Sequence, residues 1–478
     1  MILLVLVLLA FFVPSPSWAQ EPLELSLQEA LEIALRENLS LRQEALRARA
    51  AQARALTEEG AFDPALEASL TLSRELRSTA SLLAPSETHT TEGYLALKGK
   101  LRQGATYELV WEQERVWSNL GFLLLNPYYS SELRLVLTQP LFKDRGRAVQ
   151  EARLKAAQAG AEAAELQSLQ KAQEVALRVI QAYWELYYRG EALRVARLSL
   201  RLARETLKET RAKVQEGLLP PVEALAAEAE VYAAEKALAE ARGGLQDAQD
   251  RLRLLLGLSD WQRPLRCADE PRLPQEPPEV SLKEVLRRRP QYQAARRRLR
   301  EKELLRRFYA NQRLLELNLY ASAGLNGLGP SYGEGLQELF SGEFYSWQAG
   351  LVLSLPLGGR QAQGQYEQAL AEEQEAALRL REVELSITRE VLKARRALQV
   401  ALKALEAARK RSLAVQERYK AERERFKVGM ATLRETLNYQ VRYTRALLQH
   451  KRALVDAVLA QAALKKALGI LLEGAWTP

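Results

Sequence analysis

The chain has 478 residues, of which 27% are charged, and a formal net charge of +9. Its arginines alternate with glutamates along stretches of helical pattern instead of gathering in basic blocks with interleaved aromatics, which argues against a nucleic-acid partner. A single cysteine, Cys267, excludes an internal disulfide.

The N-terminus has the pattern of a secretory signal. Residues 2–13 are apolar, and Ser17-Trp18-Ala19 supplies the small residues that signal peptidase accepts. Twelve apolar residues are too few for a bilayer-spanning helix. We therefore expect residues 1–19 to be a cleaved signal peptide and the protein to be exported; an uncleaved helical anchor is the alternative.

The first half of the mature chain alternates between helical and strand patterns. Helical stretches have 3.6-type spacing and are rich in Ala, Leu, Arg and Glu, whereas the strand patterns alternate apolar and polar residues with period 2. The longest helical stretch would reach about 100 Å and is typical of a coiled coil. In chain order we expect a helix at 27–58, strands near 66–73 and 133–138, a long helix at about 148–215, a turn at Gly217 and a return helix at about 221–256.

A proline-rich linker at 258–280 leads into a second half with the same order of elements. The expected elements are a helix at 282–312, strands near 315–322 and 347–355, a long helix at about 361–427, a turn at Gly429, a return helix at about 433–468 and a tail at 471–478.

Landmark segments indicate that the second half duplicates the first. Residues 26–31 recur 255 positions later (281 − 26), 137–141 recur 216 later (353 − 137), and both 216–219 and 256–257 recur 212 later (428 − 216, 468 − 256). The drop from 255 to 216 places 39 extra residues before Pro140. We therefore predict two repeats, 20–257 and 281–470, with an insertion at about 91–130 that forms either a surface loop or a hairpin.

No other stretch approaches 18 consecutive apolar residues, so a membrane crossing would need a closed β-barrel, the other structure that satisfies every backbone group in lipid. The two strand regions carry bulky aromatics that would lie at headgroup level in a barrel, or would be ordinary packing residues in a soluble sheet. They are Tyr94, Tyr107, Trp111, Trp117, Tyr128, Tyr129, Tyr320, Tyr332, Phe340, Phe344, Tyr345 and Trp347.

At this point the chain resembles the TolC-type outer-membrane efflux family over nearly its whole mature length. The resemblance rests on the duplicated order of elements, on the strand ends Gln139–Phe142 and Leu355–Leu357, and on the stretch Arg425–Leu433 around the second turn.

The resemblance implies a mainly helical fold with a membrane β-barrel, built from two tandem repeats that each supply two amphipathic strands and a long coiled-coil hairpin. A homotrimer would close a 12-strand barrel, because four strands cannot close one alone, and an α-helical tunnel would continue it into the periplasm. The implied function is that of an outer-membrane exit duct in a tripartite efflux or type I secretion system. Its implied partners are a periplasmic adaptor (membrane fusion) protein, an inner-membrane pump of RND or ABC type, and outer-membrane lipid.

Family chemistry concentrates at the two hairpin turns. In relatives an adaptor docks on these tips, and the matching residues here are Gly217, Leu218, Leu219, Val428, Gly429 and Met430. A purely structural alternative is that each glycine caps its helix.

Acidic rings in relatives line a constriction just past the second tip. The matching positions are Glu435 and Asn438, with Glu223 as the first-half equivalent of Glu435. Glutamates on solvated helix faces are the alternative. The family's tip arginine falls on Ala431, so the resemblance implies no gate-locking ion pair.

The sequence contains no pattern that indicates an enzyme. His89 and His450 have no neighbours at metal-ligand spacing, and there is no phosphate-cradling glycine loop. We expect no catalytic residue, no metal and no cofactor. The competing function is a periplasmic coiled-coil structural or tethering protein of the cell envelope, which would have no need of amphipathic strands.

Overall fold

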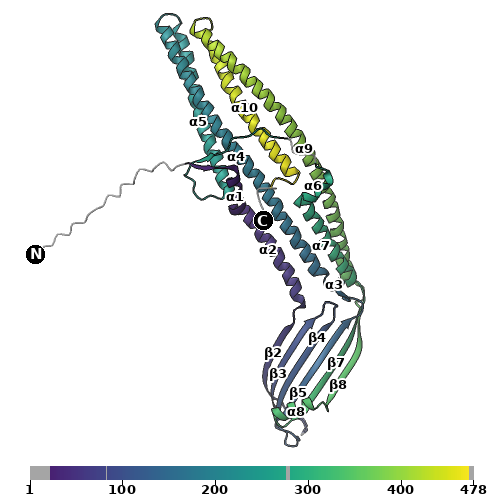
Figure 1. Ribbon diagram of the computed structural model, residues 1–478. Coiled ribbons are helices and arrows are strands. Elements are labelled where there is room, and N and C mark those ends of the chain that lie inside the picture. Colours follow the sequence, from purple (N-terminus) through teal and green to yellow (C-terminus); the bar gives the residue numbers. More distant parts are fainter. Residues whose placement is uncertain (1–21, 82, 276–279, 473–478) are drawn as a thin grey trace, which may run out of the picture. The chain divides into compact units, whose positions relative to one another are not determined.

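The computed structural model describes residues 22–81, 83–275 and 280–472, so the predicted signal peptide lies outside the described residues. The chain divides into two compact units, which are described separately (Figure 1). A helical unit is formed from residues within 1–45, 167–290 and 384–478, and a sheet unit from 46–166 and 291–383.

Two long helical hairpins dominate the helical unit. The first pairs α4 (Ala152–Gln215) with α5 (Pro221–Leu256), and the second pairs α9 (Arg360–Lys427) with α10 (Leu433–Ala467). These bounds confirm the long helix and the return helix expected in each half. Pro221 is the first residue of α5, where its missing N–H leaves no intrahelical hydrogen bond unmade.

Short elements pack beside the hairpins. They are the parallel strands β1 (Leu23–Leu25) and β6 (Leu265–Cys267) and the helices α1 (Leu27–Glu37) and α6 (Leu282–Arg288). Ser26 and Ser281, the first landmark of the sequence repeat, cap the starts of α1 and α6. Tyr183 of α4, which is 1% exposed, donates from its hydroxyl to the Leu25 carbonyl and holds β1 in place.

The single helix expected at the start of each half is broken into two. Asn38 ends α1, and its side-chain oxygen accepts from the Ser40 and Leu41 N–H groups to begin α2 (Leu39–Glu59). Its amide also donates to the Leu255 carbonyl, so the break is held by packing against α5. In the second half the break falls at Arg289, and α7 (Pro290–Gln312) starts with a proline.

The sheet unit is built on six antiparallel strands that follow the ends of α2 and α7. The remaining elements are η1 (Gly60–Phe62), β2 (Ala65–Leu76), β3 (Glu87–Lys100), β4 (Thr106–Ser118), β5 (Tyr128–Pro140), α3 (Arg147–Gln150), β7 (Glu316–Gly329), α8 (Tyr332–Ser341) and β8 (Tyr345–Ser354).

The order across the sheet corrects the predicted strand count. The order is β2-β3-β4-β5-β7-β8, so the hairpin β3–β4 lies between β2 and β5. The insertion at 91–130 is therefore part of the sheet, and the four strands assumed for a 12-strand barrel are wrong for this chain. Strands β3 and β4 belong to the sheet because their apolar and polar residues alternate in register with those of the neighbouring strands, and because they pair along nearly their whole length.

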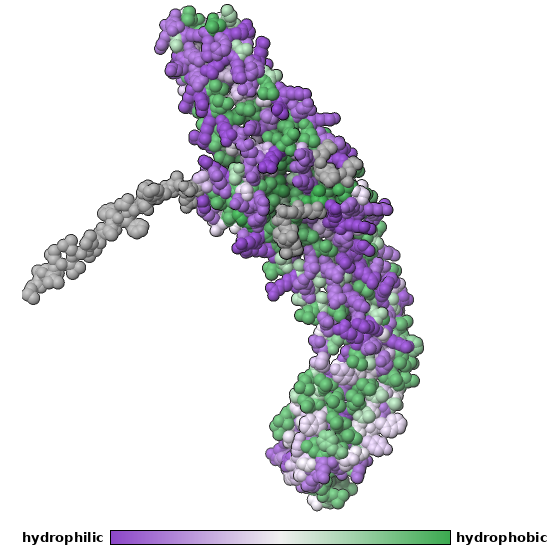
Figure 2. All heavy atoms as spheres, viewed as in Figure 1, coloured by the Kyte–Doolittle hydropathy of each residue, from purple (hydrophilic) through white to green (hydrophobic). Residues whose placement is uncertain are grey.

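The continuous register separates the sheet into an apolar and a polar face. Directly opposed residues point to the same side, and Leu66, Leu97, Leu109 and Leu135 are linked in this way across four strands. Glu67, Glu108 and their partners occupy the other side. Figure 2 shows apolar residues gathered over the strands. Within the described ranges, no helix has the length and apolar character needed to span a bilayer.

Candidate functional site at the hairpin tips

Both hairpin turns use the same glycine-capped geometry. At the end of α4, the Leu218 N–H donates to the Lys213 carbonyl at 2.8 Å and the Gly217 N–H donates to the Val214 carbonyl at 3.1 Å. The second turn repeats these two bonds at 2.8 and 3.1 Å around Gly429. This pairing is the Schellman motif, which requires a left-handed residue, and the two glycines have φ of 73° and 79°. The capping role of the glycines is therefore established.

The other predicted tip residues divide into two groups. Leu218, Val428 and Met430 are 67%, 69% and 71% exposed, although they are apolar. Leu219 instead turns inward and packs against a buried cluster formed by Ala227, Phe426 and Leu433. Only the first group remains available to a partner.

This cluster joins the two hairpins within one chain, and we call it the tip cluster. Phe426 of α9 is 2% exposed and contacts residues of α5 and α10. Lys213, from the end of α4, places its ammonium nitrogen 4.1 Å from the centroid of the Phe426 ring and also donates to the Phe426 carbonyl. A cation over an aromatic face at this distance is attractive.

Polar contacts continue between the hairpins behind the tip cluster. The Arg423 guanidinium lies 2.9 Å from a Glu205 carboxylate oxygen and 3.4 Å from one of Glu209. Beside this pair the buried Thr206 hydroxyl donates to the Gln440 side-chain oxygen at 3.2 Å. These contacts connect α4 to α9 and α10 within one chain. Arg423 lies eight residues before Ala431 (431 − 423), so the absence of a gate-locking ion pair at Ala431 stays a prediction.

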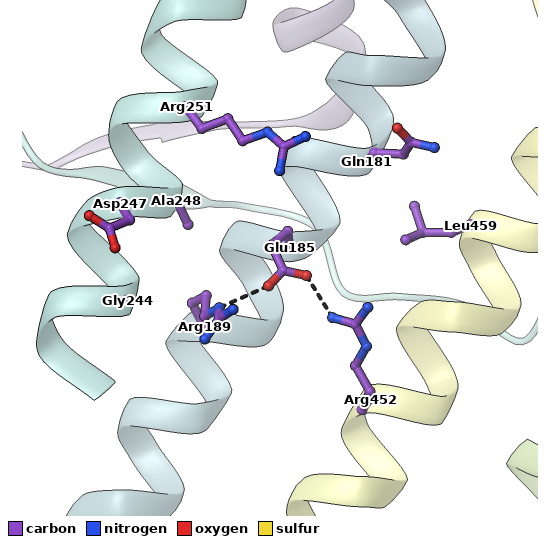
Figure 3. Close-up of a pocket in the computed structure, with 9 residues that line it drawn as sticks. All are labelled: Gln181, Glu185, Arg189, Gly244, Asp247, Ala248, Arg251, Arg452 and Leu459. Atoms are coloured by element: carbon purple, nitrogen blue, oxygen red, sulfur yellow. Dashed lines mark hydrogen bonds and ion pairs between the residues drawn. The ribbon is translucent and has the colours of Figure 1, made fainter. Parts of the chain in front are cut away.

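Farther from the tips, a polar pocket of about 390 Å³ opens between α4, α5 and α10 (Figure 3). At its centre the Glu185 carboxylate accepts from Arg189 of its own helix at 2.8 Å and from Arg452 of α10 at 2.6 Å. Lys451 and Glu191 form the next pair along, at 3.0 Å. A series of ion pairs thus links α4 to α9 and α10.

The predicted constriction residues lie on exposed or half-buried faces. Glu435 and Asn438 are both exposed and one turn apart on α10, whereas Glu223 is half-buried in the first turn of α5. Glu435 also closes a capping box, because its carboxylate accepts from the Thr432 N–H at 3.1 Å and hydroxyl at 2.9 Å. These two bonds, the backbone one foremost, lower the pKa of Glu435.

Sequence reasoning missed Lys213, Phe426, Arg423 and Gln440. Gln440 is 1% exposed although it is a polar residue on a helix rich in charged residues, and nothing in the sequence marks it as buried. Phe426 had a detectable signal, since it is the one aromatic residue next to the second turn. Among the described residues, no group of three or more potential ligands is arranged to hold a metal ion.

Comparison with known proteins agrees with the fold and the two-part organisation. The sequence matches the outer membrane efflux protein family over residues 30–258 and 281–470. No curated protein matches it significantly. Solved structures with the same fold include a membrane protein from Pseudomonas aeruginosa (TM-score 0.70, 21% identity, covering 95% of this chain and 96% of that one). Others are the outer membrane protein VceC of Vibrio cholerae (0.68, 20%, 93% and 96%) and the open state of the MtrE outer membrane channel of Neisseria gonorrhoeae (0.67, 20%, 96% and 93%).

Proposed function

Since the chain belongs to the outer membrane efflux protein family, we propose that it is the exit duct of a tripartite efflux or type I secretion assembly. In this role it conducts substrates passively from a periplasmic adaptor and an inner-membrane pump to the exterior. The observation that carries the proposal is the sheet, which has one broad, largely exposed apolar face and one polar face. Leu70, Leu72 and Leu353 are 63–74% exposed on the apolar face, an arrangement that suits lipid on one side and a wet lumen on the other.

Assembly as a homotrimer is supported by surfaces that one chain leaves uncovered. Strands β2 and β8 are the edges of the sheet, and open edges with long exposed strands invite pairing with another chain. On α9, Leu378, Leu385 and Leu392 recur every seven residues and are 73%, 57% and 53% exposed, the spacing of a coiled-coil seam. Six strands from each of three chains would supply eighteen strands to one barrel.

Part of the predicted set of tip residues suits contact with an adaptor protein. Leu218, Val428 and Met430 form an exposed apolar end that a protein partner would cover. In this proposal Gly217 and Gly429 shape the turns, while Leu219 holds the tips together. Glu435, Asn438 and Glu223 remain the proposed lining of the constriction, and the two ranges of the family match support two repeats at 20–257 and 281–470.

The test is planar-bilayer conductance of the detergent-purified mature protein, with the oligomeric mass measured on the same sample. Stable cation-preferring channels from a trimer are the expected result. A water-soluble protein that gives no channels would refute the duct and would point to the periplasmic coiled-coil tether instead.

A further inference from the structure

Helix α8 lies directly on the backbone of β7, at glycines that allow the contact. A Cβ atom added to Gly327 would lie 2.2 Å from the Gly335 carbonyl oxygen, and one added to Gly329 would lie 2.6 Å from the Gly335 nitrogen. The side-chain direction of both strand residues therefore points at α8. Such close approach of two backbones needs glycine.

The register shows which face of the sheet α8 covers. Side chains two residues apart on a strand share a face, so Gly327 and Gly329 belong with Leu325. Across β5 the register pairs Gly327 with Ser131 and Leu325 with Leu133. All of these positions are on the apolar face. Since the pairing runs without a bulge from 318 to 329, the assignment holds along the strand.

The helix is firmly attached and presents two different sides. Leu339 is 1% exposed against the sheet, and the Glu338 carboxylate accepts from the Leu328 N–H. Ser331 caps the N-terminus by accepting from the Glu334 N–H. Phe340, one position and about 100° around the helix from Leu339, is 72% exposed.

We propose that α8 is an interfacial helix that lies in the lipid headgroup layer, outside the barrel, with Phe340 inserted toward the acyl chains. The proposal rests on the proposed function, because it needs the apolar face to meet lipid. A helix on the polar face would have occupied the lumen and narrowed the duct.

Lipid is favoured over a protein partner by the continuity of the exposed apolar surface. From Phe340 it runs through Phe344 to Tyr345 and Trp347 of β8, which are 52%, 71% and 75% exposed, and on to the leucines of the sheet. Aromatic residues at the end of an apolar sheet face are typical of the membrane–water interface.

The experiment places an environment-sensitive fluorophore on single cysteines in the full mature chain. Cys267 is replaced by serine, although burial already raises the pKa of its thiol to about 12 and makes it a poor nucleophile. The labelled positions are Phe340→Cys, Leu351→Cys on the apolar face of β8 and Gln348→Cys on its polar face. Each protein is reconstituted in phosphatidylcholine vesicles that contain lipid carrying a nitroxide either at the headgroup or deep in the acyl chain.

We expect the label at 340 to be quenched more by the headgroup nitroxide than by the deep one, the label at 351 to show the opposite order, and the label at 348 to be reached only by a water-soluble quencher. A label at 340 that behaves like the one at 348, while 351 is still quenched by lipid, would overturn the α8 proposal and leave the duct intact. If neither 340 nor 351 met lipid, the duct itself would fail.

A second variant makes the result independent of the label's own effects. Gly327→Ala forces α8 off the strand, so lipid quenching at 340 should fall while quenching at 351 persists. Gly350→Ala, on β8 with no atom within 4 Å of the added Cβ, is the matched control and should change neither.

Discussion

Replacing Phe426 by alanine should release the two hairpin tips from each other. The ring is 2% exposed at the centre of the tip cluster, so its removal leaves a cavity. A substitution of this kind typically lowers stability by about 3–5 kcal/mol, and the contact with Lys213 contributes about 0.5–1 kcal/mol of that. The cluster is small and sits at helix ends, so the loss should appear as local opening and not as global unfolding.

Hydrogen exchange measured by mass spectrometry tests this directly. Amides within 205–215 and 420–440 should exchange about 100-fold faster, since 3 kcal/mol corresponds to roughly two factors of ten. Val428→Ala is the control, because that side chain is 69% exposed only two residues away and its loss should change exchange little. Unchanged exchange at the tips of a folded Phe426→Ala protein would refute the idea that this cluster holds the hairpins together.

Three further outcomes follow from the same structure. Gly429→Ala places a Cβ at φ 79° and should lower the free energy of unfolding by about 1–2 kcal/mol. Gly364→Ala, inside α9, should instead raise the free energy of unfolding by about 0.5–1 kcal/mol. Equal effects of the two substitutions on thermal unfolding would contradict the backbone argument. Arg289, which is 3% exposed, places its guanidinium 2.8 Å from the Lys466 carbonyl and 2.7 Å from Glu390. Arg289→Met removes both contacts, so thermal unfolding should show that the free energy of unfolding falls by about 2–3 kcal/mol. Unchanged stability would show that these two contacts contribute nothing. Glu435→Gln keeps a residue that can form the capping box but removes the negative charge. Helicity should therefore be unchanged, while the cation preference of single channels and their block by divalent cations weaken. A change in helicity alone would mean that Glu435 serves only to cap α10.

The pH dependence of the Glu435 cap has a definite sign. Its pKa is lowered in the folded chain by the hydrogen bonds from Thr432. The capping contribution is therefore fully present above the ordinary glutamate pKa and is lost as the pH falls through the lowered folded value. Channel measurements at neutral pH thus compare a charged Glu435 with a neutral glutamine, and the comparison reports charge and not protonation.

The periodic parts of the fold were predictable because they depend on local pattern. The long helices α4 and α9 lack proline and end at glycine turns, and the bounds differ from the prediction by only a few residues. The break at Asn38 was not predictable from local pattern alone, since the same residue is acceptable inside a helix. It is fixed by a hydrogen bond to Leu255, more than 200 residues away.

Strand pairing and side-chain contacts between helices could not be predicted from the sequence either, because they also depend on residues that are distant in the chain. The sequence places the excess of 39 residues before Pro140, but whether these residues join the sheet depends on which strands pair. That choice is made by non-local register, such as Leu109 opposite both Leu97 and Leu135. In the sequence, Arg423 cannot be distinguished from the other arginines on solvated helix faces. Only the placement of α4 beside α9 brings Glu205 close to it.

A glycine at a helix end can serve different structural roles that the sequence motif does not distinguish. Gly217 and Gly257 have almost the same φ, 73° and 72°, and both follow long helices. A Cβ at Gly257 would lie 2.8 Å from the Glu37 carbonyl oxygen, whereas one at Gly217 would meet nothing within 4 Å. At Gly257 the glycine therefore serves the backbone turn and the close packing of α1, and at Gly217 it serves the turn alone. The open space around Gly217 leaves the neighbouring Leu218 free for a partner, a property that only the three-dimensional surroundings of the motif disclose.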